Sequence, residues 1–288
     1  MDLSDLRNSL SYKDNVDITA KVLAGEGGCV DADVNLAADI LQRHRNSTQQ
    51  DSKQLCLILS AVLETLEQSK IQPTPAALFA SLVSTLQKKE AVGVSASVCI
   101  ALSMIMPQVP VAIMRKKCIE CSKIFFDIIN SHADSPKLAK PALGCLAQAV
   151  AATGPTDWTA LSPSFHLLLG RLLDPHPKVR KKAQSGVVSV FAALQDPLLS
   201  PCLADASKDL LIFTKNVLGA PEKAAQQAAN SSNKERRKAE EVIQSAVSDS
   251  LRLMACLRQI IHLIPGMVFV EVLIRIRGSV TRWNDKVY

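Results

Sequence analysis

Apolar residues recur at intervals of three and four positions along most of the chain. Between residues 51 and 66 they form one helical stripe. Pro73 and Pro75 then break the chain, and Thr74 is suited to cap a second helix that extends to about Lys88. The spacing therefore predicts an antiparallel helical hairpin. Its expected inward residues are Leu55, Ile58, Leu59, Val62, Leu63 and Leu66 of the first helix and Leu78, Leu82 and Leu86 of the second.

The same periodicity continues along the chain, with Pro, Gly, Ser and Asp at the joints. The further predicted helices cover about 92–106, 111–130, 136–152, a short piece near Trp158, 164–173, 179–194 and 199–218. Convincing alternation with period two is not found before residue 264, so no sheet is expected there. About ten helices in pairs spaced by roughly 40 residues predict an all-α fold, an α-solenoid of antiparallel hairpins.

The pattern also suggests a division of the chain. We expect an acidic, partly ordered segment over 1–32, the solenoid over 33–218, and an exposed linker of small and polar residues over 219–233. A long helix over 234–265 would continue the solenoid and end at Pro265-Gly266. Its expected inward face is Ile243, Val247, Leu251, Met254, Leu257 and Ile261.

The final segment, 266–288, is atypical. Val268, Val270, Val272, Ile274 and Ile276 lean toward a strand period, and no earlier strand is expected to pair with them. A further helix and an irregular tail are both compatible with the pattern.

Composition agrees with helices packed through aliphatic faces, because 48% of the 288 residues are hydrophobic and only 4% are aromatic. The formal net charge is +6, and residues 1–40 hold eight acidic and three basic residues. The rest of the chain is therefore clearly basic. That balance suits nucleic acid or acidic proteins as partners, and equally an ordinary solvated surface.

Nothing at the N-terminus resembles a secretory signal, and eight scattered cysteines are expected to be reduced, as in the cytosol or nucleus. Residues 91–114 carry no charge and would be long enough for a bilayer. Pro107 and Pro110 divide this stretch, so a helix, a turn and the start of another helix are predicted instead of a membrane span.

Motifs for catalysis or cofactors are not found. Cys118 and Cys121 have metal-ligand spacing, but with Met114, Phe125 and Ile128 they form a stripe typical of a helical core. The five histidines lie in different segments, and the sequence has no phosphate-binding loop. We therefore predict a protein that is not an enzyme, without catalytic, metal or cofactor residues.

Residues 167–194 are two apolar helical runs joined at Asp174-Pro175-His176-Pro177. Asp174 can cap the next helix or tie down the turn, and Pro177 suits a first helical position. Cationic residues gather here and at the start of an earlier helix. The candidate RNA or partner contacts are Arg171, Lys178, Arg180, Lys181, Lys182, Arg115, Lys116 and Lys117. Because exposed Lys is common on helices, a solvated surface is the competing interpretation.

The joint resembles the HEAT-repeat consensus, which has leucines, then Asp, Pro, Val-Arg and Ala. The matching residues are Leu169, Leu172, Leu173, Asp174, Pro177, Val179, Arg180 and Ala183. The resemblance implies a HEAT/armadillo-like superhelix, and it assigns Asp174 and Arg180 to a polar ladder between neighbouring repeats.

Three stretches are similar to the ribosomal RNA-processing protein 12 family, whose members are large nucleolar HEAT-repeat factors. They are DPHPKVRKKAQ at the joint, the stretch over residues 37–86, and DSLRLMACLRQIIHLIP over residues 249–265. The resemblance covers roughly 33–265 and suggests an N-terminal portion of such a protein.

The resemblance implies a scaffold in pre-ribosomal RNA processing and in the maturation and export of ribosomal subunits. The implied partners are pre-ribosomal particles, assembly factors and ribosomal RNA, and the implied location is the nucleus and nucleolus. The competing hypothesis is an importin-like adaptor that binds protein cargo, a small GTPase or transport factors. Lys234-Glu-Arg-Arg-Lys238 is either a nuclear-import signal or a solvated helix start.

Overall fold

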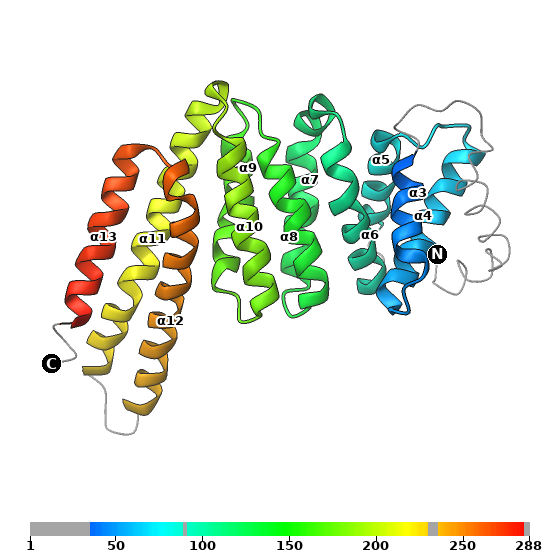
Figure 1. The fold of residues 1–288 in the computed structure, drawn as a ribbon. Helices are drawn as coiled ribbons and strands as arrows, with labels where there is room; N and C mark the ends of the chain where they lie inside the picture. Colours follow the sequence, from blue (N-terminus) through cyan, green and yellow to red (C-terminus); the bar gives the residue numbers. More distant parts are fainter. Residues whose placement is uncertain (1–34, 89–90, 230–235, 285–288) are drawn as a thin grey trace. The chain divides into compact units, whose positions relative to one another are not determined.

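The computed structural model describes residues 35–88, 91–229 and 236–284. Every regular element in these ranges is a helix, and the chain folds as an all-α solenoid of antiparallel helical hairpins, as predicted (Figure 1). It forms two compact units. The first comprises residues up to Lys117 together with Asp127–Cys145, and the second comprises Cys118–Phe126 together with the chain from Leu146. The predicted acidic segment over 1–32 lies outside the described residues.

The first unit contains α3 (Asn35–Arg45), α4 (Gln50–Gln68), α5 (Pro75–Gln87) and α6 (Val92–Ile105). The Thr74 hydroxyl accepts a hydrogen bond from the Ala77 backbone N–H at 3.2 Å, which confirms the predicted cap of α5. The predicted inward residues of α4 and α5 are buried except Ile58, which is half-buried. Packing of α4 and α5 against α6 completes this core.

Two longer helices contribute residues to both units. They are α7 (Val111–Ser131) and α8 (Pro136–Ala151), and both follow their predicted ranges closely. The uncharged stretch 91–114 is divided between α6, a short 3-10 helix over Met106–Gln108 and the start of α7, as the two prolines predicted. Within the described ranges no single helix is long and apolar enough to cross a membrane. The helices Pro177–Ala193 and Pro197–Ala228 reach that length and apolar composition only when they are counted together, and they are bent by 105° relative to each other.

After α8, the second unit continues with the hairpin of α9 (Trp158–Gly170) and α10 (Pro177–Ala193), separated by a 3-10 turn over Arg171–Leu173. The prediction of a short piece near Trp158 followed by a separate helix is wrong, because α9 continues through Pro163. Pro163 lies in the second turn of the helix, where it interrupts a single backbone hydrogen bond. Burial of Trp158, Leu161 and Phe165 along one face holds this helix together.

The predicted linker over 219–233 is wrong for residues 219–229, because α11 (Ser200–Ala229) is one helix of 30 residues. Alanine-rich sequence favours a helix, but Pro221 has no N–H to donate to the Val217 carbonyl one turn earlier. The Ser250 hydroxyl of α12 (Arg236–Ile260) is fully buried and shares its one proton between that carbonyl, at 3.2 Å, and the Ala246 carbonyl of its own helix, at 2.9 Å. A neighbouring helix thus supplies the hydrogen bond that the proline cannot make.

The structure also corrects the inward face of α12. Leu251 was expected to be buried and is 56% exposed, whereas the buried positions are Ser250, Leu253, Cys256, Leu257 and Ile260. The face is rotated by about one residue from the predicted one. Small Ser and Cys side chains lie on the buried face, where α12 packs closely against α11.

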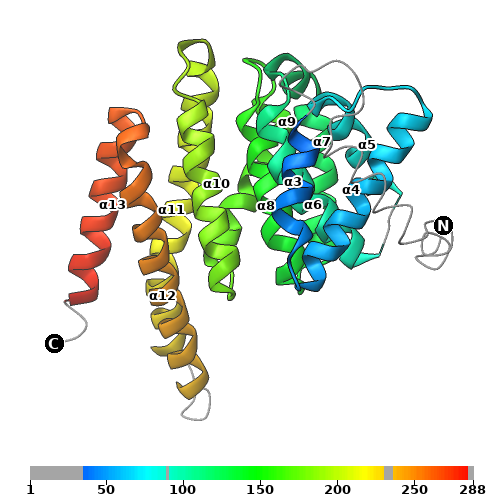
Figure 2. The ribbon, with the colours of Figure 1, turned by 45° about the vertical axis from the view of Figure 1, so that its right-hand side comes forward.

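The final segment is a helix, α13 (Gly266–Asn284), so the helical alternative is correct and the irregular tail is wrong for these residues. The preceding helix α12 ends at Ile260 and a 3-10 turn over Ile261–Leu263 follows, so the predicted helix end at Pro265-Gly266 is a few residues too late. Figures 1 and 2 show α11, α12 and α13 side by side, with α13 parallel to α11 and α12 antiparallel to both. Valine and isoleucine tolerate the helix here because packing against α11 outweighs their modest helix propensity.

Candidate functional site at the α9–α10 hinge

Asp174 is the centre of the hinge, with its side chain only 4% exposed. Its Oδ2 accepts a hydrogen bond from Arg171 Nη1 at 2.9 Å, and its Oδ1 accepts one from the His176 backbone N–H at 2.9 Å. His176 occupies the cap position of α10 without a side-chain cap bond, and Pro177 follows in the first helical turn. Of the two roles predicted for Asp174, the structure selects the one that ties down the turn.

Arg180 also stabilises the turn between α9 and α10. Its Nη1 donates to the carbonyl of Asp174 at 2.7 Å and to the carbonyl of Pro175 at 2.8 Å. One cation therefore binds two carbonyls of the turn just before the helix begins. In the described part of the chain, the side-chain bonds of Asp174 and Arg180 stay within residues 171–180, and the ladder between repeats stays a prediction.

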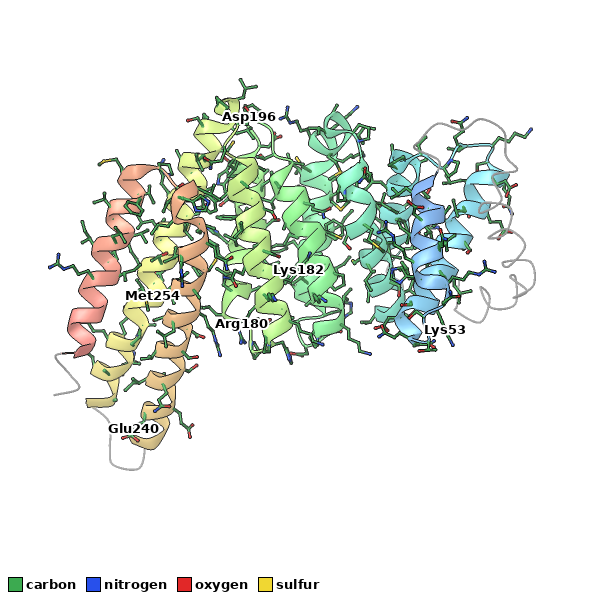
Figure 3. All side chains as sticks on the ribbon, viewed as in Figure 1. Lys53, Arg180, Lys182, Asp196, Glu240 and Met254 are labelled. Atoms are coloured by element: carbon green, nitrogen blue, oxygen red, sulfur yellow. The ribbon has the colours of Figure 1, made fainter. Side chains whose placement is uncertain are left out.

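The five predicted cations around the hinge fall into two groups with different roles. Arg171 and Arg180 hold the turn, whereas Lys178, Lys181 and Lys182 form a surface that we call the lysine face. Lys178 and Lys181 are exposed and Lys182 is half-buried, and among the described residues none of the three makes an ion pair. Spacing of three and four residues places them on one side of α10. Figure 3 shows Arg180 and Lys182 on the half of α10 that follows the hinge.

A second helix lies along α10 beside this face. Gln184 Nε2 donates to the Ala255 carbonyl at 3.3 Å, and Gln195 Nε2 donates to the Leu263 carbonyl at 2.8 Å. Because the two contacts follow the same order along both helices, α12 runs parallel to α10 here. Arg258, one turn after Ala255, is exposed and lies further from the lysine face than Ala255 does.

Close packing fixes the position of α10. A Cβ added at Gly186 would lie 2.9 Å from the Cβ of Ala147 and 3.6 Å from a methyl of Leu168. A contact of 2.9 Å is shorter than van der Waals packing permits, so only glycine allows this approach. The lysine face is therefore presented by a helix with little freedom to move against its neighbours.

The second predicted cluster, Arg115, Lys116 and Lys117, lies near the start of α7. All three side chains are exposed. They belong to the first compact unit, and the hinge belongs to the second. We therefore treat the two clusters as separate basic surfaces.

Asp209 on α11 gathers three side chains from α9. Its Oδ2 accepts from Trp158 Nε1 at 3.2 Å and from the Ser162 hydroxyl at 2.9 Å, and its Oδ1 lies 3.3 Å from His166 Nε2. The sequence analysis missed this His–Asp pair. Ser162 donates to the carboxylate and not to His166, so the arrangement is not that of a nucleophile activated by a base. It joins α9 to α11.

The cysteine pair of α7 is part of the core, as predicted. Cys118 and Cys121 are each 1% exposed, and burial raises the pKa of the Cys118 thiol. Burial also raises the pKa of the Cys256 thiol to about 12. In the ranges that the structure describes, no group of three or more His, Cys, Asp or Glu side chains could hold a metal ion.

Comparison with known proteins adds the family. The family model described as RRP12-like, N-terminal HEAT repeats, matches residues 27–274. The chain belongs to this RRP12-like family. It is similar to the RRP12-like proteins of Homo sapiens and Gallus gallus, with 30% identity over 173 residues in each case. That alignment covers 59% of this chain and 13% of either relative.

The RRP12-like match confirms the predicted resemblance and includes both basic clusters and the hinge. It ends at residue 274, within α13. The chain thus corresponds to a small N-terminal part of the much longer RRP12-like relatives.

Proposed function

We propose that this chain is a non-enzymatic HEAT-repeat scaffold in ribosome biogenesis, where it acts in pre-ribosomal RNA processing and in the maturation and export of ribosomal subunits. The proposal places it in the nucleus and nucleolus, bound to pre-ribosomal particles and their assembly factors. Membership of the RRP12-like family supports this proposal. Stacked helical hairpins support it physically, because they offer a broad ridged surface for distributed contacts.

The observation that carries the RNA part of the proposal is the lysine face. Lys178, Lys181 and Lys182 lie on one side of α10, and no ion pair within the described residues neutralises them. Cations that approach RNA phosphates release condensed counterions, so binding weakens steeply as salt rises. Hydrogen bonds at the hinge and close packing of α10 already restrict this helix, so less conformational entropy is lost when it binds RNA.

This contact would read the RNA backbone and not its sequence. The Trp and Phe side chains of α9 and α10 are buried, and they pack on each other with ring centroids 5.2 Å apart for Trp158–Phe165 and 5.9 Å apart for Phe165–Phe191. Bases are usually recognised by stacking on exposed aromatic rings. Apart from the exposed imidazole of His176, the described hinge offers phosphate contacts without such rings.

Charge reversal tests the proposal. The triple variant Lys178→Glu, Lys181→Glu, Lys182→Glu is compared with Lys53→Glu, Lys137→Glu, Lys140→Glu, which changes the net charge equally at three exposed positions. Fluorescence anisotropy with a labelled ribosomal RNA fragment is measured across a salt series. The lysine-face variant should reduce the slope of log affinity against log salt by about 2, since each lost phosphate contact removes roughly 0.7. The control should stay close to wild type.

Equal loss in both variants would show that only net charge matters and would contradict an RNA site at the hinge. Circular dichroism melting of both variants separates loss of binding from loss of fold. A chain that is indifferent to RNA and binds a nuclear small GTPase would instead support the importin-like adaptor.

A further inference from the structure

One hydroxyl group of this chain follows a pair of arginines at a spacing that favours phosphorylation. Arg43 and Arg45 lie five and three residues before Thr48. In the whole sequence Thr48 is the one serine or threonine with an arginine three residues before it. Protein kinases that select basic substrates bind arginines at these two positions through carboxylates, so the charges before a hydroxyl decide whether it is modified. The sequence therefore singles out Thr48.

The structure places Thr48 in an accessible loop. This loop covers residues 46–49, between α3 and α4, and Thr48 is exposed. Its hydroxyl makes no hydrogen bond to any described residue, whereas the neighbouring Ser47 hydroxyl accepts the Gln49 backbone N–H at 3.3 Å. Gln49 has extended backbone angles, φ −70° and ψ 133°. A kinase binds its substrate as an extended segment, so this loop needs little rearrangement to enter an active site.

Both arginines are available for recognition. Arg43 and Arg45 are exposed, and within the described ranges neither makes an ion pair. They lie in the last turn of α3, and the ends of helices open most readily. Opening this turn would break one described side-chain hydrogen bond, between His44 Nδ1 and the Ser52 hydroxyl at 3.3 Å. The two cations can therefore reach a kinase together with the loop.

A second hydroxyl shows what the structure adds to the charge pattern. Ser185 has Arg180 and Lys182 at the same two distances before it. It lies in the middle of α10, and its hydroxyl donates to the Lys182 carbonyl at 2.9 Å. The next residue, Gly186, is closely packed, so this segment becomes extended only if α10 unfolds. The folded chain thus presents Thr48 to a kinase and withholds Ser185.

We propose that Thr48 is a phosphorylation site for a protein kinase that recognises Arg43 and Arg45. Thr48 Oγ1 attacks the γ-phosphorus of a nucleoside triphosphate and forms a new O–P bond, while the bond from that phosphorus to the β–γ bridging oxygen breaks. The hydroxyl proton passes to the catalytic aspartate of the kinase, and the nucleoside diphosphate leaves. The phosphate carries a charge of about −2 at neutral pH.

Phosphorylation changes the charge at this end of α3. A phosphate beside Arg43 and Arg45 offsets their charge, because arginine pairs with phosphate through charge-assisted hydrogen bonds. The phosphate also precedes α4, whose cap residue, Gln49, makes no side-chain hydrogen bond to the helix. Negative charge favours a helix start, but the Asp51 carboxylate in the first turn repels the phosphate. The main effect is therefore the loss of a basic surface.

The test uses the whole folded chain, ATP and a purified kinase that selects arginine three and five residues before its acceptor. Mass spectrometry of peptides gives the initial rate at each hydroxyl. The variant Arg43→Gln, Arg45→Gln should slow phosphorylation of Thr48 at least about 10-fold, because two charge-assisted contacts are lost. The matched control is Lys137→Gln, Lys140→Gln, which removes two exposed cations from α8. Its rate should stay within about two-fold of wild type.

A comparison within the wild-type chain tests the role of the structure. Thr48 should be modified at least about 10-fold faster than Ser185, because only Thr48 is reached without unfolding a helix. Wild-type chain without phosphate on Thr48, or with a faster rate at Ser185, would overturn the proposal. These two outcomes do not depend on the stability of any variant.

The arginine variant supplies the remaining outcomes. An unchanged rate at Thr48 in this variant would overturn recognition through Arg43 and Arg45. Asp51 lies three residues after Thr48, where kinases that prefer acidic substrates bind a carboxylate. Phosphorylation of Thr48 only by a kinase of that type, and its loss in Asp51→Asn, would also contradict the proposal. Circular dichroism melting shows whether each variant is folded.

Discussion

The hinge between α9 and α10 and the end formed by α11, α12 and α13 are stabilised in different ways. At the hinge the decisive hydrogen bonds join residues no more than six positions apart, such as Arg180 and the carbonyl of Asp174. At the α11–α13 end they join Ser250 to Val217 and Lys215 to Glu271, across 33 and 56 residues. Local sequence therefore determines the first region, and tertiary packing determines the second.

This difference explains why a proline has opposite effects in the two regions. Pro177 begins α10 where its missing N–H costs nothing. Pro221 lies inside α11, where a missing N–H leaves the Val217 carbonyl without its helical partner. Ser250 supplies the replacement from another helix. In α11 the helix continues through its proline, and the carbonyl left unpaired has a donor in a neighbouring helix.

The largest effect is expected at the hinge. Asp174→Ala removes the partner of Arg171 and the acceptor of the His176 N–H in a buried setting, and should lower the free energy of unfolding by about 3 kcal/mol. Urea denaturation followed by circular dichroism measures this. Asp205→Ala is the matched control, because Asp205 also pairs with a cation three residues away, but both side chains are more than half exposed. Its effect should be under about 0.5 kcal/mol.

Equal losses in the two variants would contradict the role of the hinge as a buried, locally determined joint.

A smaller effect is expected where α11 passes through Pro221. Ser250→Ala should lower the free energy of unfolding by about 1–2 kcal/mol, because the Val217 carbonyl is then buried without a donor. In a Pro221→Ala background the N–H of residue 221 can donate to that carbonyl, so the same serine change should cost under about 0.5 kcal/mol. A double-mutant cycle from urea denaturation gives the coupling. Additive losses would refute the proposed replacement of one donor by the other.

The smallest effect is expected at the ion pair that holds α13. The hydrogen bond from Lys215 lowers the pKa of the Glu271 carboxyl. A lowered folded-state pKa adds stability above the unfolded pKa, and this stability is lost as the pH falls through the folded pKa. Glu271→Gln should therefore lower the melting temperature at pH 7 by less than Ser250→Ala does. The difference from wild type should vanish in acid, and a difference that persists there would indicate a cause other than charge.

Much of the fold could be predicted from the sequence, because most helices have residues at their ends that mark where the helix begins or stops. Thr74 with Pro75, and Asp174 with Pro177, mark starts that the structure confirms. The errors lie where boundaries depend on partners distant in sequence. The continuity of α11 depends on Ser250, and the helical state of α13 depends on packing of Val272 against a helix far away in the chain.

The candidate site was predicted in part. The sequence placed cations around residues 171–182, but it could not separate those that hold the hinge from those that face solvent. Arg171 and Arg180 donate hydrogen bonds within the turn, Arg171 to the Asp174 carboxylate and Arg180 to the Asp174 carbonyl. The Asp209 cluster was missed because its contributors are about 50 residues apart.

We propose that Lys178, Lys181 and Lys182 contact RNA phosphates from a hinge that is held by hydrogen bonds within residues 171–180. Lysine acetylation followed by mass spectrometry, with and without a ribosomal RNA fragment, tests it most directly. We predict that RNA slows acetylation of these three lysines several-fold at low salt, that protection disappears at about 0.5 M salt, and that Lys53, Lys137 and Lys140 change little. Equal protection of all six lysines, or none at the hinge, would contradict the claim.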